Sequence, residues 1–321
     1  MTGHIDSLNT DRKSGPELEL IVHSAMKSAN SGTNFPRGGG LRLFAMFVGA
    51  SLALTPSATR GQAAALVKYR VTPESTDSSI HRFNDPHYVV FERTTTSAAP
   101  LLVFMPGTGG MPERTSAFAD LAAHMGYRVI GLEYTDTPAV AQLCPKNRDP
   151  KCSEHFRQKR IYGDDVTDVI DDRPSESVVN RLTRLLTTLY HDHPTEGWAD
   201  YLENGQPKWG KIAVSGLSQG AGMAAYIAQK TLVARVILFS SPWDNYGPRQ
   251  TLAPWIVTGH GETPADRWFA AYHEKEPTAA AIARAYAALG IPSSQIRVFT
   301  LEPAPTPAYL EDWRFLMGSV R

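Results

Sequence analysis

Short apolar segments alternate with helical patterns along the chain from about residue 66 onward. Leu66–Thr72 and Tyr88–Thr94 alternate in polarity and predict short strands. Leu101–Met105 is continuously apolar, which is typical of a strand buried on both faces. Further strands are predicted at Arg128–Tyr134, Lys211–Val214, Arg235–Phe239, Pro254–Val257 and Ile296–Leu301.

Segments whose apolar residues recur at helical spacing lie between these strands. Residues 178–190 place their apolar side chains on one face, as an amphipathic helix does. The other helices are predicted at 112–125, 220–230, 264–289 with a possible break at Pro277, and 309–317. Alternating strands and helices predict an α/β fold with a mostly parallel sheet, covered by helices on both faces. Active sites in such sheets lie beyond the carboxyl ends of the strands.

The segment 135–175 is polar and rich in aspartate, and we interpret it as a solvated loop over the sheet. The acidic cluster lacks the glycine and terminal glutamate of a calcium loop. Cys144 and Cys152, the two cysteines of the chain, lie in the stretch LCPKNRDPKC and predict a small disulfide loop. A zinc site would need two more soft ligands, and only His155 is nearby, so no metal is expected.

The amino-terminal region predicts a targeting segment. Leu43–Leu54 is an uncharged apolar run that follows basic residues and precedes a candidate cleavage site at 61–63. This order is typical of a secretory signal peptide over residues 26–63, and the run is too short to span a bilayer. A buried helix is the alternative. With Met26 as the true start, residues 1–25 would be a disordered upstream extension, and residues 64–321 a single secreted or periplasmic domain.

Composition and charge argue against some classes of binding partner. The hydrophobic residues make up 42% of the chain, enough for a sizeable core. The 32 basic and 32 acidic side chains cancel, which argues against a binder of nucleic acid or of anionic membranes. The oligomeric state is not indicated by the sequence.

One pentapeptide has the form of a nucleophile site. Gly216-Leu217-Ser218-Gln219-Gly220 fits G-x-S-x-G and lies between a predicted strand and a predicted helix. The turn is so tight that the positions two before and two after the serine must lack bulk. The serine hydroxyl then projects above the sheet, near the positive end of the next helix. A plain strand-to-helix turn is the alternative.

A glycine-rich loop complements this serine. Acyl transfer needs two N–H groups that point at the developing oxyanion. Gln219 follows the nucleophile and would supply one of them. The loop at 106–110 (PGTGG) follows a buried strand and would supply the other, from Thr108 or next from Gly109. A phosphate-binding loop is the competing interpretation, but its Lys-Ser/Thr pair is missing.

With these features the chain resembles the α/β-hydrolase family over about residues 66–317. Among its members it looks most like secreted bacterial ones, through the stretches GLSQGAGMAAYIA and LFSSPWDNYGP. The resemblance implies the α/β-hydrolase fold, with a mostly parallel eight-stranded sheet and a serine nucleophile. It also implies an acid after the sixth or seventh strand and a histidine after the eighth.

The acid and the histidine are harder to assign. Asp244 follows the strand at 235–239, whereas Asp266 and Glu262 follow the one predicted at 254–257; we favour Asp266. No histidine lies beyond His273, so the usual position after the last strand is empty. His260 is the best placed substitute, and His273 falls within a predicted helix. Otherwise the base is lost.

These observations favour a serine hydrolase that acts on small carboxylic esters through an acyl-enzyme on Ser218. His260 would be its base, and Asp266 would orient that base. No cofactor is implied. The missing terminal histidine motivates an alternative, a catalytically impaired binding protein on the same fold. A peptidase or polyester depolymerase would share the serine.

Overall fold

The structure is a computed structural model that describes residues 65–300 and 309–318. The predicted extension at 1–25 and signal peptide at 26–63 lie outside the described residues. In the part that is described, no helix combines the length and the apolar character needed to cross a membrane.

An eight-stranded sheet organises the described residues, in the order β1-β2-β4-β3-β7-β8-β11-β12. Its strands are β1 (Leu66–Val71), β2 (His87–Glu92), β3 (Leu101–Met105), β4 (Arg128–Gly131), β7 (Ile212–Leu217), β8 (Arg235–Phe239), β11 (Trp268–His273) and β12 (Ile296–Phe299). β2 pairs antiparallel with both β1 and β4, and the pairs from β4 to β12 are all parallel.

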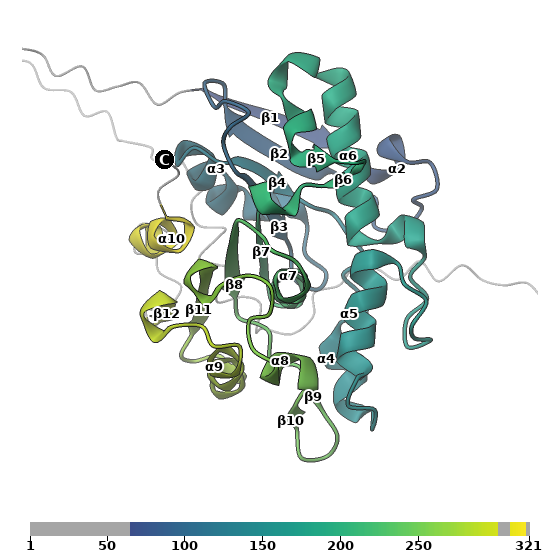
Figure 1. Cartoon of the computed structure of the whole chain (residues 1–321), viewed down its shortest axis with the longest axis vertical. Coiled ribbons are helices and arrows are strands. Elements are labelled where there is room, and N and C mark those ends of the chain that lie inside the picture. Colours follow the sequence, from purple (N-terminus) through teal and green to yellow (C-terminus); the bar gives the residue numbers. More distant parts are fainter. Residues whose placement is uncertain (1–64, 301–308, 319–321) are drawn as a thin grey trace, which may run out of the picture.

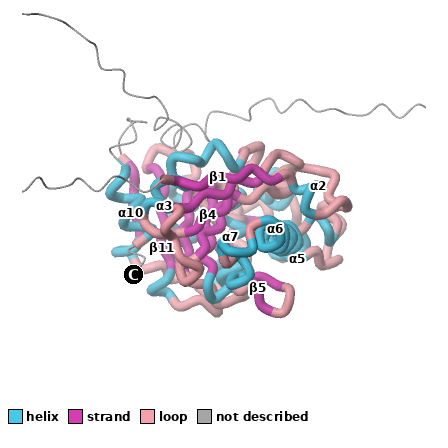
Figure 2. The backbone as a smooth tube through the Cα atoms, turned by 90° about the horizontal axis from the view of Figure 1, so that it is seen from above, coloured by secondary structure: helices cyan, strands magenta, loops and turns pink. Residues whose placement is uncertain are grey.

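Helices cover both faces of this sheet (Figure 1). They are α2 (Pro73–Thr76), α3 (Ser116–His124), α4 (Val140–Leu143), α5 (Cys152–Tyr162), α6 (Val178–Asp192), α7 (Gln219–Lys230), α8 (Pro254–Val257), α9 (Ala279–Ala288) and α10 (Leu310–Met317). Figure 2 shows α3 and α10 on one side of the strands and α5, α6 and α7 on the other. Within the described residues, two short antiparallel ribbons lie outside this sheet, β5 (Leu202–Glu203) with β6 (Gln206–Pro207) and β9 (Asn245–Tyr246) with β10 (Thr251–Leu252).

The pleat of the strands divides the buried apolar residues between two cores, because successive side chains point to opposite faces. Along β3, Leu101 and Val103 belong to the core under α5 to α7, whereas Leu102 and Phe104 belong to the core under α3 and α10. The strand order, the parallel register and the two helical layers are those of the α/β-hydrolase fold, as predicted.

Most predicted elements are confirmed within a few residues. One exception matters for the site. Residues 254–257 form the helix α8, so the strand predicted there is wrong. The seventh strand of the sheet is instead β11, which lies inside the region 264–289 that we predict as helical. The aromatic residues of WFAAYH suit a strand, but its alanines and polar flanks favour a helix by propensity.

The interpretation of 135–175 as a solvated loop is also wrong in part. It contains the helix α5, whose buried face carries charged residues, among them Arg157 and Arg160. A helix whose buried face carries charged residues shows no apolar periodicity, so the hydrophobic pattern of the sequence does not predict it. Asp172 of the acidic cluster is buried, and its Oδ2 accepts from Arg160 Nε at 2.6 Å. The predicted disulfide between Cys144 and Cys152 is present.

A buried histidine at the start of β2 is held neutral. The Nδ1 atom of His87 accepts from the backbone N of Glu133 at 2.9 Å. Burial, together with the positive charge of Arg181, lowers the pKa of His87 to about 3. In the unfolded chain the histidine pKa is about 6.5. The unfolded state therefore takes up a proton first as the pH falls, and folding stability is lost below about pH 6.5.

We expect protonation of His87 in the unfolded state to account for part of the stability that the protein loses in acid. Between pH 7 and pH 4 the wild type should lose about 3 kcal/mol of unfolding free energy more than His87→Asn, which does not titrate. Urea unfolding at both pH values measures the difference. His191→Asn, at an exposed position, is the control and should behave as wild type. Equal acid sensitivity of His87→Asn and wild type would contradict the assignment.

Candidate active site

Ser218 lies in a strained turn between β7 and α7. Its backbone angles are φ 50° and ψ −115°, and it is the N-cap of α7. This is a sparsely populated conformation for a residue with a side chain, and such strain is concentrated at functional sites. The turn is fixed at both ends, because Ser218 N donates to Phe239 O and Gly222 N donates to Ser218 O. The chain thus turns sharply from strand to helix at Ser218, as the pentapeptide predicts.

The two glycines of the pentapeptide have no room for a side chain. A Cβ atom at Gly216 would lie 2.4 Å from the carbonyl carbon of Gly220. A Cβ atom at Gly220 would lie 2.0 Å from the carbonyl oxygen of Met105, at the end of β3. These contacts are with backbone atoms, which cannot move aside without displacing a central strand. The close approach of α7 to the end of β3 therefore depends on Gly220, and the tight turn from β7 into α7 depends on Gly216.

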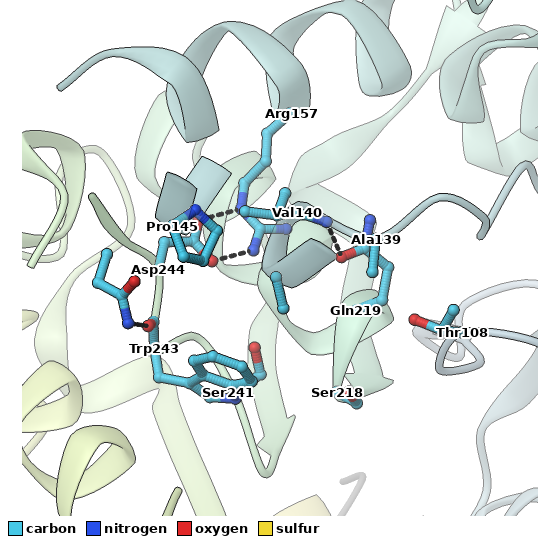
Figure 3. Close-up of a pocket in the computed structure, with 12 residues that line it drawn as sticks. Thr108, Ala139, Val140, Pro145, Arg157, Ser218, Gln219, Ser241, Trp243 and Asp244 are labelled. Atoms are coloured by element: carbon cyan, nitrogen blue, oxygen red, sulfur yellow. Dashed lines mark hydrogen bonds and ion pairs between the residues drawn. The ribbon is translucent and has the colours of Figure 1, made fainter. Parts of the chain in front are cut away.

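A small pocket with a cavity volume of about 60 Å³ opens beside Ser218. Thr108 and Gln219 line it together with Ser218, as the sequence leads one to expect of an oxyanion site. In Figure 3, Thr108 and Trp243 lie on opposite sides of Ser218. The loop after β3 that carries Thr108 is closed by a hydrogen bond from Gly110 N to Gly107 O. The structure thus brings the predicted nucleophile and both predicted oxyanion residues to one pocket.

The disulfide loop and α4 form another wall of this pocket. Val140 and Pro145 line it, and Pro145 lies between the two bridged cysteines. Gln219 connects this wall to the elbow, because its Oε1 atom accepts from Val140 N at 3.3 Å. The segment that the sequence presents as a polar loop is therefore part of the candidate site.

Asp244, the acid after β8, is engaged in a buried ion pair. Arg157 Nε donates to its Oδ2 at 2.7 Å and Arg157 Nη2 donates to its Oδ1 at 2.6 Å. The indole nitrogen of Trp255 also donates to Oδ2, at 3.0 Å. Both ionic side chains are almost fully buried. Within the described residues this carboxylate orients an arginine, and it contacts no histidine.

His260 and its neighbours lie at the opposite end of α7 from Ser218. Gln229 Nε2, near the end of that helix, donates to Gly259 O, and Glu262 N donates to Gln229 O. A helix rises 1.5 Å per residue, so this loop is about 15 Å from the start of α7 along its axis. The strand wrongly predicted at 254–257 led us to expect His260 after the seventh strand. His260 instead precedes the seventh strand, β11, in the chain.

Asp266 lies in the short 3₁₀ turn that directly precedes β11, and it is exposed. Because β11 runs parallel to β8, this turn is at the amino edge of the sheet, away from Ser218. The structure brings neither His260, Glu262 nor Asp266 to the nucleophile. Their roles as base and acid stay predictions without geometric support.

Glu276, an acid that does follow the seventh strand, was missed as a candidate. Glu276 is buried just beyond β11, and its Oε1 accepts from Ser240 Oγ and from His273 N, both at 2.7 Å. Burial raises the pKa of the Glu276 carboxyl, while these hydrogen bonds act in the opposite direction. His273 is the last residue of β11 and is also buried, with Nδ1 accepting from Lys275 N. Correct assignment of β11 as a strand would have revealed this acid.

No histidine lines the pocket beside Ser218 in the ranges 65–300 and 309–318. The same ranges contain no group of three or more histidine, cysteine, aspartate or glutamate side chains that could hold a metal ion.

The structure is similar to solved structures of other proteins. Scans of protein-family models and of curated proteins find no match. A cold-adapted esterase from an Arctic intertidal metagenomic library is 11% identical with a TM-score of 0.45, over 82% of this chain and 96% of that one. The thermophilic carboxylesterase EstE1, cloned from a metagenomic library, is 12% identical with a TM-score of 0.46, over 81% and 90%. An esterase of Pyrobaculum calidifontis is 14% identical with a TM-score of 0.41, over 80% and 86%. Likeness at this level carries no argument about function.

Proposed function

We propose that the protein is a serine hydrolase that cleaves carboxylic esters of small molecules through an acyl-enzyme on Ser218. The observation that carries the proposal is the strained backbone of Ser218 at the start of α7, in a pocket shared with Thr108 and Gln219. A hydroxyl held at a helix N-terminus beside potential backbone donors is suited to nucleophilic acyl transfer.

In the proposed reaction Ser218 Oγ attacks the carbonyl carbon of the ester. The N–H groups of Gln219 and Thr108 stabilise the oxyanion. The bond from the carbonyl carbon to the alcohol oxygen then breaks, and the alcohol leaves with the proton that Ser218 gave up. Water attacks the acyl-enzyme in the second half, releasing the carboxylic acid and restoring the serine hydroxyl.

A second candidate function is a catalytically impaired binding protein on this fold. The observation that favours it is the pocket lining, which includes no histidine among the described residues. Loss of the base from a serine triad removes most of its catalytic power and leaves the modest contribution of the oxyanion site. Such a protein would fold and bind ligands without turning over simple esters.

The disulfide supports the further proposal that the protein is exported, to the periplasm or the medium. Cys144 and Cys152 are bridged, and such bonds persist in oxidising compartments.

A fluorophosphonate probe separates the two functions, because it labels serines that are activated as nucleophiles. We expect stoichiometric labelling of the folded protein, with the adduct on the tryptic peptide 212–230. Fragment masses within this peptide should assign the adduct to Ser218 and not to Ser215. The absence of labelling, under conditions that label a control esterase, would favour the binding protein.

A further inference from the structure

The side-chain hydroxyl of Thr108 is a polar group of the Ser218 pocket that the proposed reaction does not use. Thr108 lines this pocket and is half-buried. Its Oγ1 atom has no hydrogen-bond partner among the described residues. Other threonine hydroxyls bind nearby carbonyl oxygens, as Thr115 Oγ1 donates to Pro112 O at 2.7 Å. The hydroxyl of Thr108 therefore keeps a proton that it can donate to a ligand.

The pairing of β3 with β7 brings Thr108 beside the turn at Ser218. The two strands run parallel, with Met105 opposite Gly216. Thr108 follows Met105 by three residues and Ser218 follows Gly216 by two, so both lie just beyond the carboxyl edge of neighbouring strands. A Cβ atom at Gly220 would lie 2.0 Å from Met105 O, so the start of α7 touches the end of β3. The two side chains therefore reach one pocket from adjacent positions.

The backbone on both sides of Thr108 is fixed. The turn that Gly110 N closes has Gly109 as its third residue, with a φ of 70°, which is typical of a type II turn. Just before this turn, Tyr134 Oη donates to Pro106 O at 2.9 Å. The residue that carries the hydroxyl is thus positioned before a substrate binds, as the stabilisation of an oxyanion requires.

The side chain of Thr108 is turned toward the proposed oxyanion site. In Figure 3 its oxygen atom lies on the side that faces Gln219 and Ser218. The oxyanion of the proposed reaction forms at Ser218, beside the N–H of Gln219. The hydroxyl and the backbone N–H of one threonine can donate to the same oxygen, since only two carbon atoms separate the two donors.

A negative oxygen in this pocket must be stabilised by neutral donors. Among the described residues that line the pocket, Arg157 alone is basic. Its charge is already neutralised by Asp244, whose Oδ1 lies 2.6 Å from Arg157 Nη2. A hydrogen bond to a charged oxygen is about twice as strong as one to a neutral oxygen. A hydroxyl donor would therefore contribute more to the tetrahedral intermediate than to the bound ester.

We propose that the Thr108 hydroxyl is a third donor to the oxyanion, in addition to the N–H groups of Gln219 and Thr108. It strengthens its hydrogen bond as charge develops on the carbonyl oxygen, so it stabilises the transition state more than the ground state. Thr108 is then a catalytic residue through its side chain as well as its backbone. This inference deepens the proposed function and rests on Ser218 as the nucleophile.

Two substitutions separate the hydroxyl from the backbone donor. Thr108→Val keeps the shape and the N–H but removes the hydroxyl, whereas Thr108→Ser keeps both donors. With p-nitrophenyl acetate, Thr108→Val should lower kcat by about 10²-fold with little change in KM, as loss of an oxyanion donor does. Thr108→Ser should retain most of the wild-type kcat. Thr187→Val, at an exposed position of α6, is the control and should leave kcat unchanged. Urea unfolding confirms that each variant is folded.

The outcomes separate this inference from the proposed function. Wild-type kcat in Thr108→Val, or equal losses in Thr108→Val and Thr108→Ser, would overturn the third donor and leave the esterase in place. A raised KM at unchanged kcat would overturn it as well, because the hydroxyl would then bind ester and oxyanion equally. If the wild type hydrolyses no ester, the proposed function and the third donor are both refuted.

Discussion

Replacement of Ser218 by alanine is expected to lower kcat/KM for p-nitrophenyl acetate by about 10⁴-fold or more, with the fold intact. The physical reason is that no acyl-enzyme can form without the hydroxyl, and only the oxyanion site still acts on bound ester. Initial rates of p-nitrophenolate release measure the loss. The free energy of unfolding in urea should be close to that of wild type, because alanine keeps the Cβ atom and removes a hydroxyl that makes no capping hydrogen bond.

Ser215 offers a matched control in β7, three positions before Ser218 in the chain. It is buried, and its Oγ has no hydrogen-bond partner among the described residues. Ser215→Ala should therefore keep wild-type kcat/KM. If Ser218→Ala and Ser215→Ala were equally active, Ser218 would not be the nucleophile.

Disruption of the Arg157–Asp244 pair is expected to cause the largest loss of stability. Arg157→Met leaves the buried carboxylate of Asp244 without its charge partner, and such losses are about 3–5 kcal/mol. The double variant Arg157→Met/Asp244→Leu removes both charges and should recover much of this loss. Urea unfolding at pH 7 measures both free energies.

An exposed ion pair provides the comparison. Lys208 Nζ lies 2.8 Å from Glu203 Oε1, and both side chains are accessible to solvent. Lys208→Met should cost less than about 1 kcal/mol, since water screens the pair. A double variant no more stable than Arg157→Met alone would show that packing and not the buried charge explains the loss.

The sharp strand-to-helix turn at Ser218 was predictable because its cause is local. The tight turn demands small residues around Ser218, and the sequence shows them between an apolar strand and a helix. The flanking strands were predictable for a similar reason, since a strand buried on both faces, such as β3, must be continuously apolar. Thr108 could be assigned to the same pocket because the ends of parallel strands meet at one edge of a sheet.

The positions of the candidate acids and histidines were not predictable in this way. The sequence WFAAYH allows either helix or strand, and only pairing with β8 and β12 makes it β11. That pairing places His273 and Glu276, and not His260 and Asp266, at the carboxyl edge of the seventh strand. The helix α5 was missed because its buried face is ionic, and its arginines become tolerable only when Asp172 and Asp244 arrive from distant segments.

The sequence by itself determined the fold class, the tight turn at Ser218, the glycine-rich loop and the Cys144–Cys152 pair, because each depends on local pattern or short spacing. The tertiary structure alone decided which acids are buried, which histidines are far from Ser218, and which side chains line its pocket. Those properties depend on contacts between residues such as Arg157 and Asp244, which are 87 positions apart in the chain.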